Sequence, residues 1–242
     1  MIYHKKESKQ LTIEEFSNPP AKFRGAPFWA WNTDLNEEEL LRQVECLKEM
    51  GFGGFFMHTR SGMSTKYLSE EFMNLVSACN KKAKELGMYS YLYDEDRWPS
   101  GAAGGYVTEN KAFRLKMLVL SRLTPDETQK KYKGREQDPK LLATYDIVFD
   151  EYGKLKSYSL SDKNCETIGE RWFAYSMLAE KSGWFNGYTY LDTMNPEAVD
   201  RFIEVTYDAY YNTLGEEFGK SVPAIFTHEP RYYAMTFKGY RA

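Results

Sequence analysis

The sequence predicts an α/β fold in which a parallel sheet is interrupted by an antiparallel β insertion. In the first hundred residues, short buried apolar segments alternate with amphipathic helical segments. This order is typical of βαβ units and therefore of a parallel sheet. From about residue 110, alternating strand-like segments joined by short turns replace the helices. The α/β pattern resumes near residue 195, so the β-rich part is expected to be an insertion.

The first helix carries clear end signals. Asn36 can cap its N-terminus, Glu39 stands three residues later as a capping-box partner, and Gly51 follows its last turn. Ser69 and Gly87 bound the second helix in the same way. The expected order is strand 26–31, helix 36–51, strand 52–58, helix 69–87 and strand 88–94.

The remainder divides into a β-rich segment and a return to α/β structure. Residues 124–140 are polar and are expected to form a loop, and Asn195 and Pro196 mark the start of the last helix. A fourth parallel strand is expected at 221–226. The expected domains are 1–109 (three strands of the parallel part), 110–185 (β insertion) and 186–242 (helix and fourth strand). The insertion is either a structural appendage or a lid that shapes a substrate site.

Composition excludes several classes of protein. The chain has 242 residues and a net charge of −3, so neither a basic nucleic-acid surface nor a polybasic membrane patch is expected. No apolar segment approaches the length of a membrane-spanning helix. The N-terminus lacks the apolar core of a signal peptide, which predicts a cytoplasmic protein, or an extracytoplasmic one if the true N-terminus is missing. Cys46, Cys79 and Cys165 are widely spaced, which fits free thiols.

Aromatic residues make up 16% of the chain, and polar side chains gather after the expected strands. Carboxylates and aromatic walls at one edge of a parallel sheet suit glycosidic bond cleavage, in which one carboxylic acid protonates the leaving oxygen and a second carboxylate activates water or attacks carbon. Each side chain also has a structural alternative, as an ion-pair partner, a turn cap or a packing residue. The candidates are Trp29, Trp31 and Asn32, His58 and Arg60, Asp94, Glu95, Asp96 and Trp98, and His228 and Glu229.

Four motifs carry a resemblance to a known family: "PFWAWN", "GGFFMHTRSGMSTKYLSEEF", "YLYDEDRWPSGAAGG" and "FTHEP". In this order they resemble the catalytic region of the family 106 glycoside hydrolases, the α-L-rhamnosidases, over most of residues 20–235. The resemblance implies a partial (β/α)8 (TIM-type) barrel of about four βα units. It also implies inverting hydrolysis of α-L-rhamnosides in plant or bacterial glycans, and a possible Ca²⁺ requirement. Glu229 matches the catalytic acid, and the other candidates are then expected to bind substrate.

The sequence departs from the family at two points. An acidic residue usually precedes the catalytic glutamate, whereas this chain has His228. The chain also resembles only the N-terminal half of the catalytic region, and the second catalytic carboxylate is expected from the missing half. Two alternatives therefore stay open: a hydrolase for another glycoside, or a non-catalytic carbohydrate-binding half-barrel. Exposed half-barrel edges would favour association into homo-oligomers.

Overall fold

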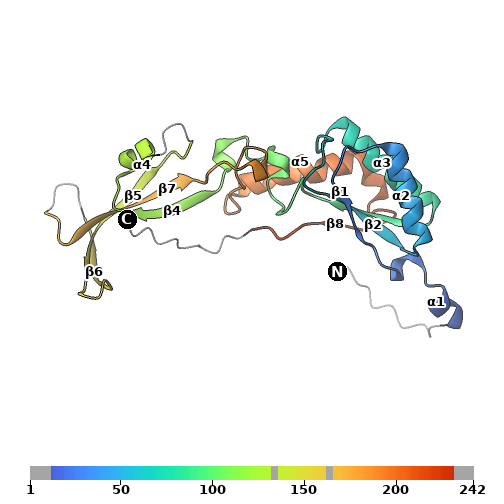
Figure 1. Cartoon of the computed structure of the whole chain (residues 1–242), viewed down its shortest axis with the longest axis horizontal. Coiled ribbons are helices and arrows are strands. Elements are labelled where there is room, and N and C mark those ends of the chain that lie inside the picture. The colour runs from blue at the N-terminus through green and yellow to red at the C-terminus, as the bar shows by residue number, and fades with distance from the viewer. Residues whose placement is uncertain (1–11, 132–135, 162–165, 232–242) are drawn as a thin grey trace. The chain divides into compact units, whose positions relative to one another are not determined.

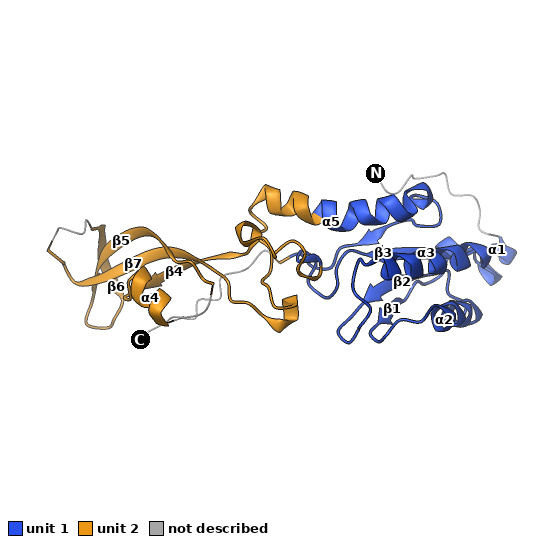
Figure 2. Cartoon of the chain, turned by 90° about the horizontal axis from the view of Figure 1, so that it is seen from above, with its two compact units in different colours: residues 1–103, 203–230 blue, residues 104–202, 231–242 orange. Residues whose placement is uncertain are grey.

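The computed structural model describes residues 12–131, 136–161 and 166–231. The chain divides into two compact units (Figure 2). Unit 1 contains the chain up to Ala103 and residues Ile203–Pro230, and unit 2 contains Gly104–Phe202 and the chain from Arg231. Among the described residues, no helix is long and apolar enough to cross a membrane.

Unit 1 is built on a four-stranded parallel sheet (Figure 1). The strand order is β1-β2-β3-β8, and the described strands do not close into a barrel. The predicted α/β class with parallel strands is confirmed. The strands are β1 (Phe28–Trp31), β2 (Gly54–Thr59), β3 (Tyr89–Tyr93) and β8 (Ile225–Phe226), and the helices are α1 (Ile13–Ser17), α2 (Glu37–Glu49), α3 (Glu70–Glu85) and α5 (Pro196–Leu214), which begins in unit 2.

The helix ends lie where the sequence signals placed them. Asn36 accepts a hydrogen bond from the backbone N–H of Glu39 at 3.0 Å, and Ser69 caps α3 in the same way. Gly51 and Gly87 follow the two helices with φ of 88° and 64°, in the left-handed region that glycine adopts most easily. These caps fix the short connections that lead into β2 and β3.

The two faces of the sheet are lined differently. On one face Trp31, Phe55 and Leu92 are at most 1% exposed, and the ring of Trp31 meets that of Phe72 on α3 edge to face. The opposite face carries Phe28, Phe56, Tyr91 and Phe226, whose ring centroids lie 4.5 to 5.8 Å apart in the contacting pairs. Phe28 is 53% exposed, so the helices cover the first face much more completely than the second.

The fourth strand is shorter than expected. Only Ile225 and Phe226 pair with β3 as strand residues, opposite Leu92 and Tyr93, so the expected strand 221–226 is wrong over its first four residues. The backbone N–H of Val222 instead donates to the carbonyl of Glu217 at 3.1 Å, which holds this part of the segment in a turn.

Unit 2 contains the expected antiparallel insertion. Its strands pair in the order β4-β7-β5-β6, and Thr128 on a short helix contacts the buried hydroxyl of Tyr175 at 2.8 Å. The strands are β4 (Lys116–Ser121), β5 (Lys140–Phe149), β6 (Leu155–Leu160) and β7 (Glu170–Leu178).

Short 3₁₀ turns occur in both parts of the chain. In unit 1 they are Ala21–Phe23 and Gly215–Glu217, and the others are Ala103–Gly105, Lys111–Phe113 and Gly183–Phe185.

The expectation of a loop over residues 124–140 is wrong at its start. Helix α4 spans Pro125–Lys131. Thr124 accepts from the backbone N–H of Glu127 at 3.2 Å, and the Glu127 carboxylate accepts from the backbone N–H of Thr124 at 2.8 Å. This is a capping box with proline at the first helical position, so the sequence contained the helix signal.

Candidate functional site

Four of the expected site residues come together at the carboxyl ends of β2, β3 and β8. The ring of His58 lies 5.8 Å from that of His228, between centroids, and both rings contact Tyr93. The Trp98 indole lies 6.4 Å from the His228 ring and donates its Nε1–H to Glu229 Oε2 at 2.9 Å. Parallel strand order therefore produces the juxtaposition that the sequence predicted for these side chains.

Glu229 is the exposed carboxylate of this group. It lies in the left-handed region of backbone conformation, with φ of 47°, and is followed by Pro230. A non-glycine residue in this region costs about 1 kcal/mol or more, and such residues concentrate at functional sites. The hydrogen bond from Trp98 holds Oε2 of Glu229, which leaves the other carboxyl oxygen, Oε1, as the one that can meet a ligand.

His58 and His228 are held in their neutral forms. Burial, assisted by the positive charge of Arg60, lowers the pKa of His58 to about 4. Burial also lowers the pKa of His228, against the opposing effect of Glu229. His58 is 5% exposed, and its buried Nε2 has no hydrogen-bond partner among the described residues. A buried polar atom without a hydrogen-bond partner costs free energy, so the free Nε2 of His58 points to a ligand or a water molecule at the site.

Arg60 follows β2 directly and is exposed. Its backbone N–H donates to the carbonyl of Trp31 at 2.9 Å, which fixes the start of its turn. Because alternate residues of a strand share a face, Arg60 is on the same side as His58, and its charge lowers the pKa of both histidines.

Asp94 joins three segments of unit 1 and is fully buried. Its carboxylate accepts from the hydroxyls of Ser100 at 2.5 Å, Thr227 at 2.7 Å and Tyr207 at 2.8 Å. Burial raises the pKa of Asp94, and the three hydroxyl donors limit that rise. These contacts give Asp94 a structural role in holding β8 and α5 against β3.

Glu95 and Asp96 are also committed to local contacts. Glu95 is 1% exposed and accepts from the backbone N–H groups of Asp96 at 2.9 Å, Gly101 at 2.8 Å and Ala103 at 2.7 Å. Asp96 accepts from Arg97 Nε at 2.9 Å. The first carboxylate therefore shapes the turn that carries Trp98, and the second balances the charge of its neighbour.

Trp29, Trp31 and Asn32 are not brought into this group. Trp29 donates its indole N–H to Gln43 on α2 at 2.7 Å, and Trp31 lies buried against α3. Asn32 is exposed, and its carbonyl oxygen faces Gly62, where an added Cβ would lie 2.6 Å away. These positions indicate packing and turn formation.

The sequence places Tyr93 in the scaffold or the pocket wall and does not single out Ser100, Tyr207 or Thr227, although all four contact the site residues. Tyr93 lies two residues after Tyr91 on a strand that ends at the site, and this alternation was the available signal. Tyr207 had no such signal, because it comes from α5, far along the chain from Asp94.

The residues present do not fit the Ca²⁺ ion that the resemblance implies. Within the described ranges, no three His, Cys, Asp or Glu side chains gather in a way that could hold a metal ion. Asp94 and Glu95 have oxygen atoms that a cation could use, but hydroxyl and backbone N–H groups already occupy them. Calcium ligands are oxygen atoms in larger numbers than this group leaves open.

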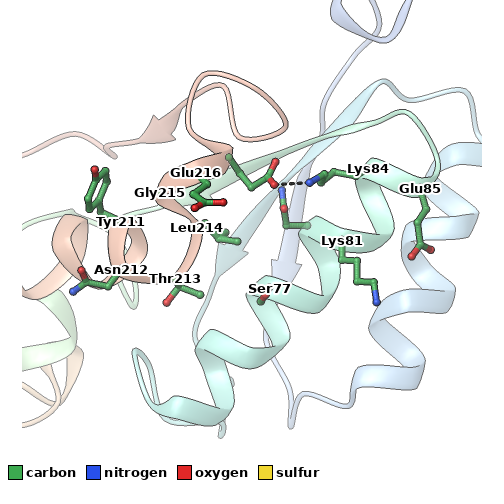
Figure 3. A pocket seen from close by; sticks show the side chains of 12 residues that line it. Ser77, Lys81, Lys84, Glu85, Tyr211, Asn212, Thr213, Leu214, Gly215 and Glu216 are labelled. Atoms are coloured by element: carbon green, nitrogen blue, oxygen red, sulfur yellow. Dashed lines mark hydrogen bonds and ion pairs between the residues drawn. The ribbon is translucent and has the colours of Figure 1, made fainter.

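A separate cavity of about 630 Å³ lies between α3 and the end of α5 (Figure 3). Its lining runs over residues 77–85 and 211–217, and Lys84 forms an ion pair with Glu217 beside it. Asn80 anchors this end of the sheet by donating to Ser90 at 2.7 Å and Ser221 at 2.9 Å. These serines lie near the amino ends of β3 and β8, so the cavity is distinct from the site at the carboxyl ends.

No protein-family model matches the sequence, and no curated protein matches it. Among solved structures, the chain is similar to the structure of a rhamnosidase from Novosphingobium sp. PP1Y, with 15% sequence identity and a TM-score of 0.37. The similarity covers 59% of this chain and 17% of that chain, so this chain spans a small part of that protein's length. A similarity of this size is too low to identify the function of this chain.

Proposed function

We propose that this chain is part of a glycoside hydrolase of the α-L-rhamnosidase type, that its parallel sheet is part of a (β/α)8 barrel, and that Glu229 is its general acid. The observation that carries the proposal is the bond from Trp98 Nε1 to Glu229 Oε2, 2.9 Å long, at the carboxyl ends of parallel strands. It fixes the position of an exposed carboxyl group at the strand ends, and a positioned carboxylic acid is the group that protonates a sugar's leaving oxygen. The sequence motifs around both residues support the same assignment.

In this reaction Glu229 Oε1 donates a proton to the glycosidic oxygen as the bond to the sugar carbon breaks. Arg60, His58 and His228 lie near one another at the same edge of the sheet, and we propose that they bind sugar hydroxyls. Inversion also requires a carboxylate that activates water from the opposite side of the ring. By the family resemblance, that base belongs to the half of the barrel that this sequence does not contain.

A non-catalytic carbohydrate-binding role is the second candidate. The observation that favours it is the commitment of the other strand-end carboxylates, because Asp94, Glu95 and Asp96 all accept hydrogen bonds from neighbouring groups. A carboxylate held in this way is poorly placed to activate a water molecule.

A panel of p-nitrophenyl glycosides tests the proposal. Because the proposed base comes from the other half of the barrel, the panel is measured on a protein that contains both halves. Hydrolysis of the α-L-rhamnoside that disappears in Glu229→Gln and persists in Glu85→Gln, an exposed glutamate at the end of α3, supports the proposal. Hydrolysis of a different glycoside with the same dependence on Glu229 would support Glu229 as the general acid and would contradict rhamnose as the substrate sugar. Calorimetric binding of a sugar without turnover of any glycoside would support the binding role instead.

The uncovered sheet face predicts self-association as well. Phe28, Phe56 and Phe226 contribute apolar surface to it, and Phe28 is the most exposed of them. Sedimentation velocity over a range of concentrations should show a dimer or larger species. A monomer at the highest concentration would contradict this prediction while leaving the assignment of Glu229 open.

A further inference from the structure

Tyr93 is a buried tyrosine whose hydroxyl meets an imidazole at the site. The Tyr93 hydroxyl oxygen lies 3.3 Å from His228 Nδ1, and the Tyr93 side chain is fully buried. Its ring packs between His58, at a centroid distance of 4.2 Å, and Phe226, at 6.3 Å. These contacts hold the hydroxyl in place, so the partner that it meets is set by the fold.

The direction of this hydrogen bond follows from the groups around it. If His228 carried its proton on Nδ1, the phenol oxygen would accept and the buried O–H would have to find another acceptor. Among the described residues, His228 is the hydrogen-bond partner of this hydroxyl. A buried donor without an acceptor costs about 1–3 kcal/mol, so the phenol donates and Nδ1 accepts.

We propose that Tyr93 is a positioning residue that fixes His228 as the Nε2–H tautomer, so that His228 presents a hydrogen-bond donor beside Glu229. The choice of tautomer rests on the contacts alone. The use of that donor, to bind a sugar oxygen next to the general acid, rests on the proposed function. The neutral imidazole N–H of His228 then occupies the position at which the family that this chain resembles usually has an acidic residue.

The charged and titratable groups around His228 are compatible with this arrangement. Burial raises the pKa of Tyr93, so the phenol keeps its proton. Burial and Arg60 lower the pKa of His228, while Glu229 and Asp94 act in the opposite sense. Among the described residues, His58 on β2 is a further titratable neighbour, and its low pKa keeps it uncharged at neutral pH, so it does not repel His228.

Nitrogen-15 NMR of the full chain tests the tautomer directly. The chain has three histidines, so long-range proton–nitrogen spectra contain few imidazole signals. The variants His58→Gln and His228→Gln each remove one set of signals and so assign two of the three histidines. At neutral pH we expect His228 to show an unprotonated Nδ1, a protonated Nε2, and a slowly exchanging hydroxyl proton from Tyr93. A protonated Nδ1 in the unmodified chain overturns the proposal, whatever the variants do.

Tyr93→Phe should remove the hydroxyl proton and give His228 a mixture of tautomers. Tyr91→Phe is the matched control, because Tyr91 is on the same strand and face but stacks on Phe56. An unchanged His228 spectrum in Tyr93→Phe contradicts the positioning role.

Titration with methyl α-L-rhamnopyranoside separates this inference from the proposed function. If both hold, the sugar shifts the His228 Nε2–H signal, and Tyr93→Phe weakens binding about five-fold, as the loss of one positioned hydrogen bond would. If the tautomer is as expected and the sugar does not bind, the positioning role stands and the assignment of this sugar fails. If the sugar binds with the same affinity in Tyr93→Phe, Tyr93 does not position His228 for the ligand.

Discussion

Asp94 and Tyr207 are joined by a hydrogen bond of 2.8 Å between the carboxylate and the phenol, although 113 residues separate them in the sequence. Asp94 follows β3, and Tyr207 lies in α5, which returns the chain to unit 1 after the insertion. A buried carboxylate must have its oxygens satisfied, so this contact helps to specify where α5 packs.

Tyr207→Phe should lower the free energy of unfolding by about 2 kcal/mol, because it removes one donor from a buried carboxylate. The same change should raise the pKa of Asp94 further, since its hydroxyl donors oppose the effect of burial. Urea denaturation measures the first effect. Tyr211→Phe, on the exposed side of the same helix, is the control and should change stability little. Equal stability of the two variants would contradict the role of this contact.

Glu95→Gln should destabilise unit 1 by about 2–3 kcal/mol, because at least one of three backbone N–H groups would then face an amide NH₂. Thermal denaturation followed by circular dichroism measures the loss. Glu85→Gln serves as the control, because Glu85 is exposed and its change should stay within about 0.5 kcal/mol. If Glu95→Gln were equally mild, its carboxylate would not be organising the turn after β3.

His58 should make stability depend on pH in the acidic range. Its pKa falls from 6.5 to about 4 on folding, so between these values the unfolded chain binds more protons than the folded one. The corresponding stability is present in full above pH 6.5 and is lost as the pH falls to about 4. The expected size is about 3 kcal/mol.

Unfolding free energies at pH 7 and pH 4.5 should therefore differ less in His58→Gln than in the unmodified chain. Comparison of the two chains removes the contributions of carboxylates that titrate in the same range. An identical pH dependence in both would show that the folded protein does not hold this imidazole neutral.

Gly53→Ala should destabilise the chain by about 3 kcal/mol, through a steric clash that cannot relax easily. An added Cβ would lie 2.0 Å from the carbonyl oxygen of Ala21, where the N-terminal 3₁₀ turn crosses the start of β2. Gly183→Ala is the control, because an added Cβ there meets no atom within 4 Å. Denaturation midpoints of the two variants distinguish a specific clash from the general effect of replacing glycine.

The sequence predicted most of what local signals encode. Asn36 and Ser69 marked helix starts, glycines marked helix ends, and the strand pattern gave the parallel sheet and the antiparallel insertion. It missed α4, although Thr124 and Glu127 supplied a capping box, because the polar composition of the segment suggested a loop. Cys46 and Cys79 are free thiols as expected, and Cys165 lies outside the described residues.

The site was harder to predict, because burial depends on contacts between distant segments. Nothing local distinguishes Asp94, which is buried under three hydroxyls, from Glu229, which is exposed. Trp29 and Trp31 looked like ligand-binding aromatics, but their side of the strand faces the helices. Strand-end position alone predicts which residues lie near the site, and only the packing shows which of them face it.

The position of unit 2 within the chain sets an order of assembly during synthesis. Residue 92 of β3 cannot pair with residue 225 of β8 until the whole insertion has left the ribosome. Within unit 2, the amide N–H of Leu115 donates to the carbonyl of Tyr190, and Asn186 donates to the carbonyl of Gly104, both at 2.9 Å. Folding of the insertion therefore brings its own two ends together and shortens the effective loop that the last strand must close. The folded insertion therefore holds the two flanking parts of unit 1 close together in the chain, and the sheet of unit 1 is completed last.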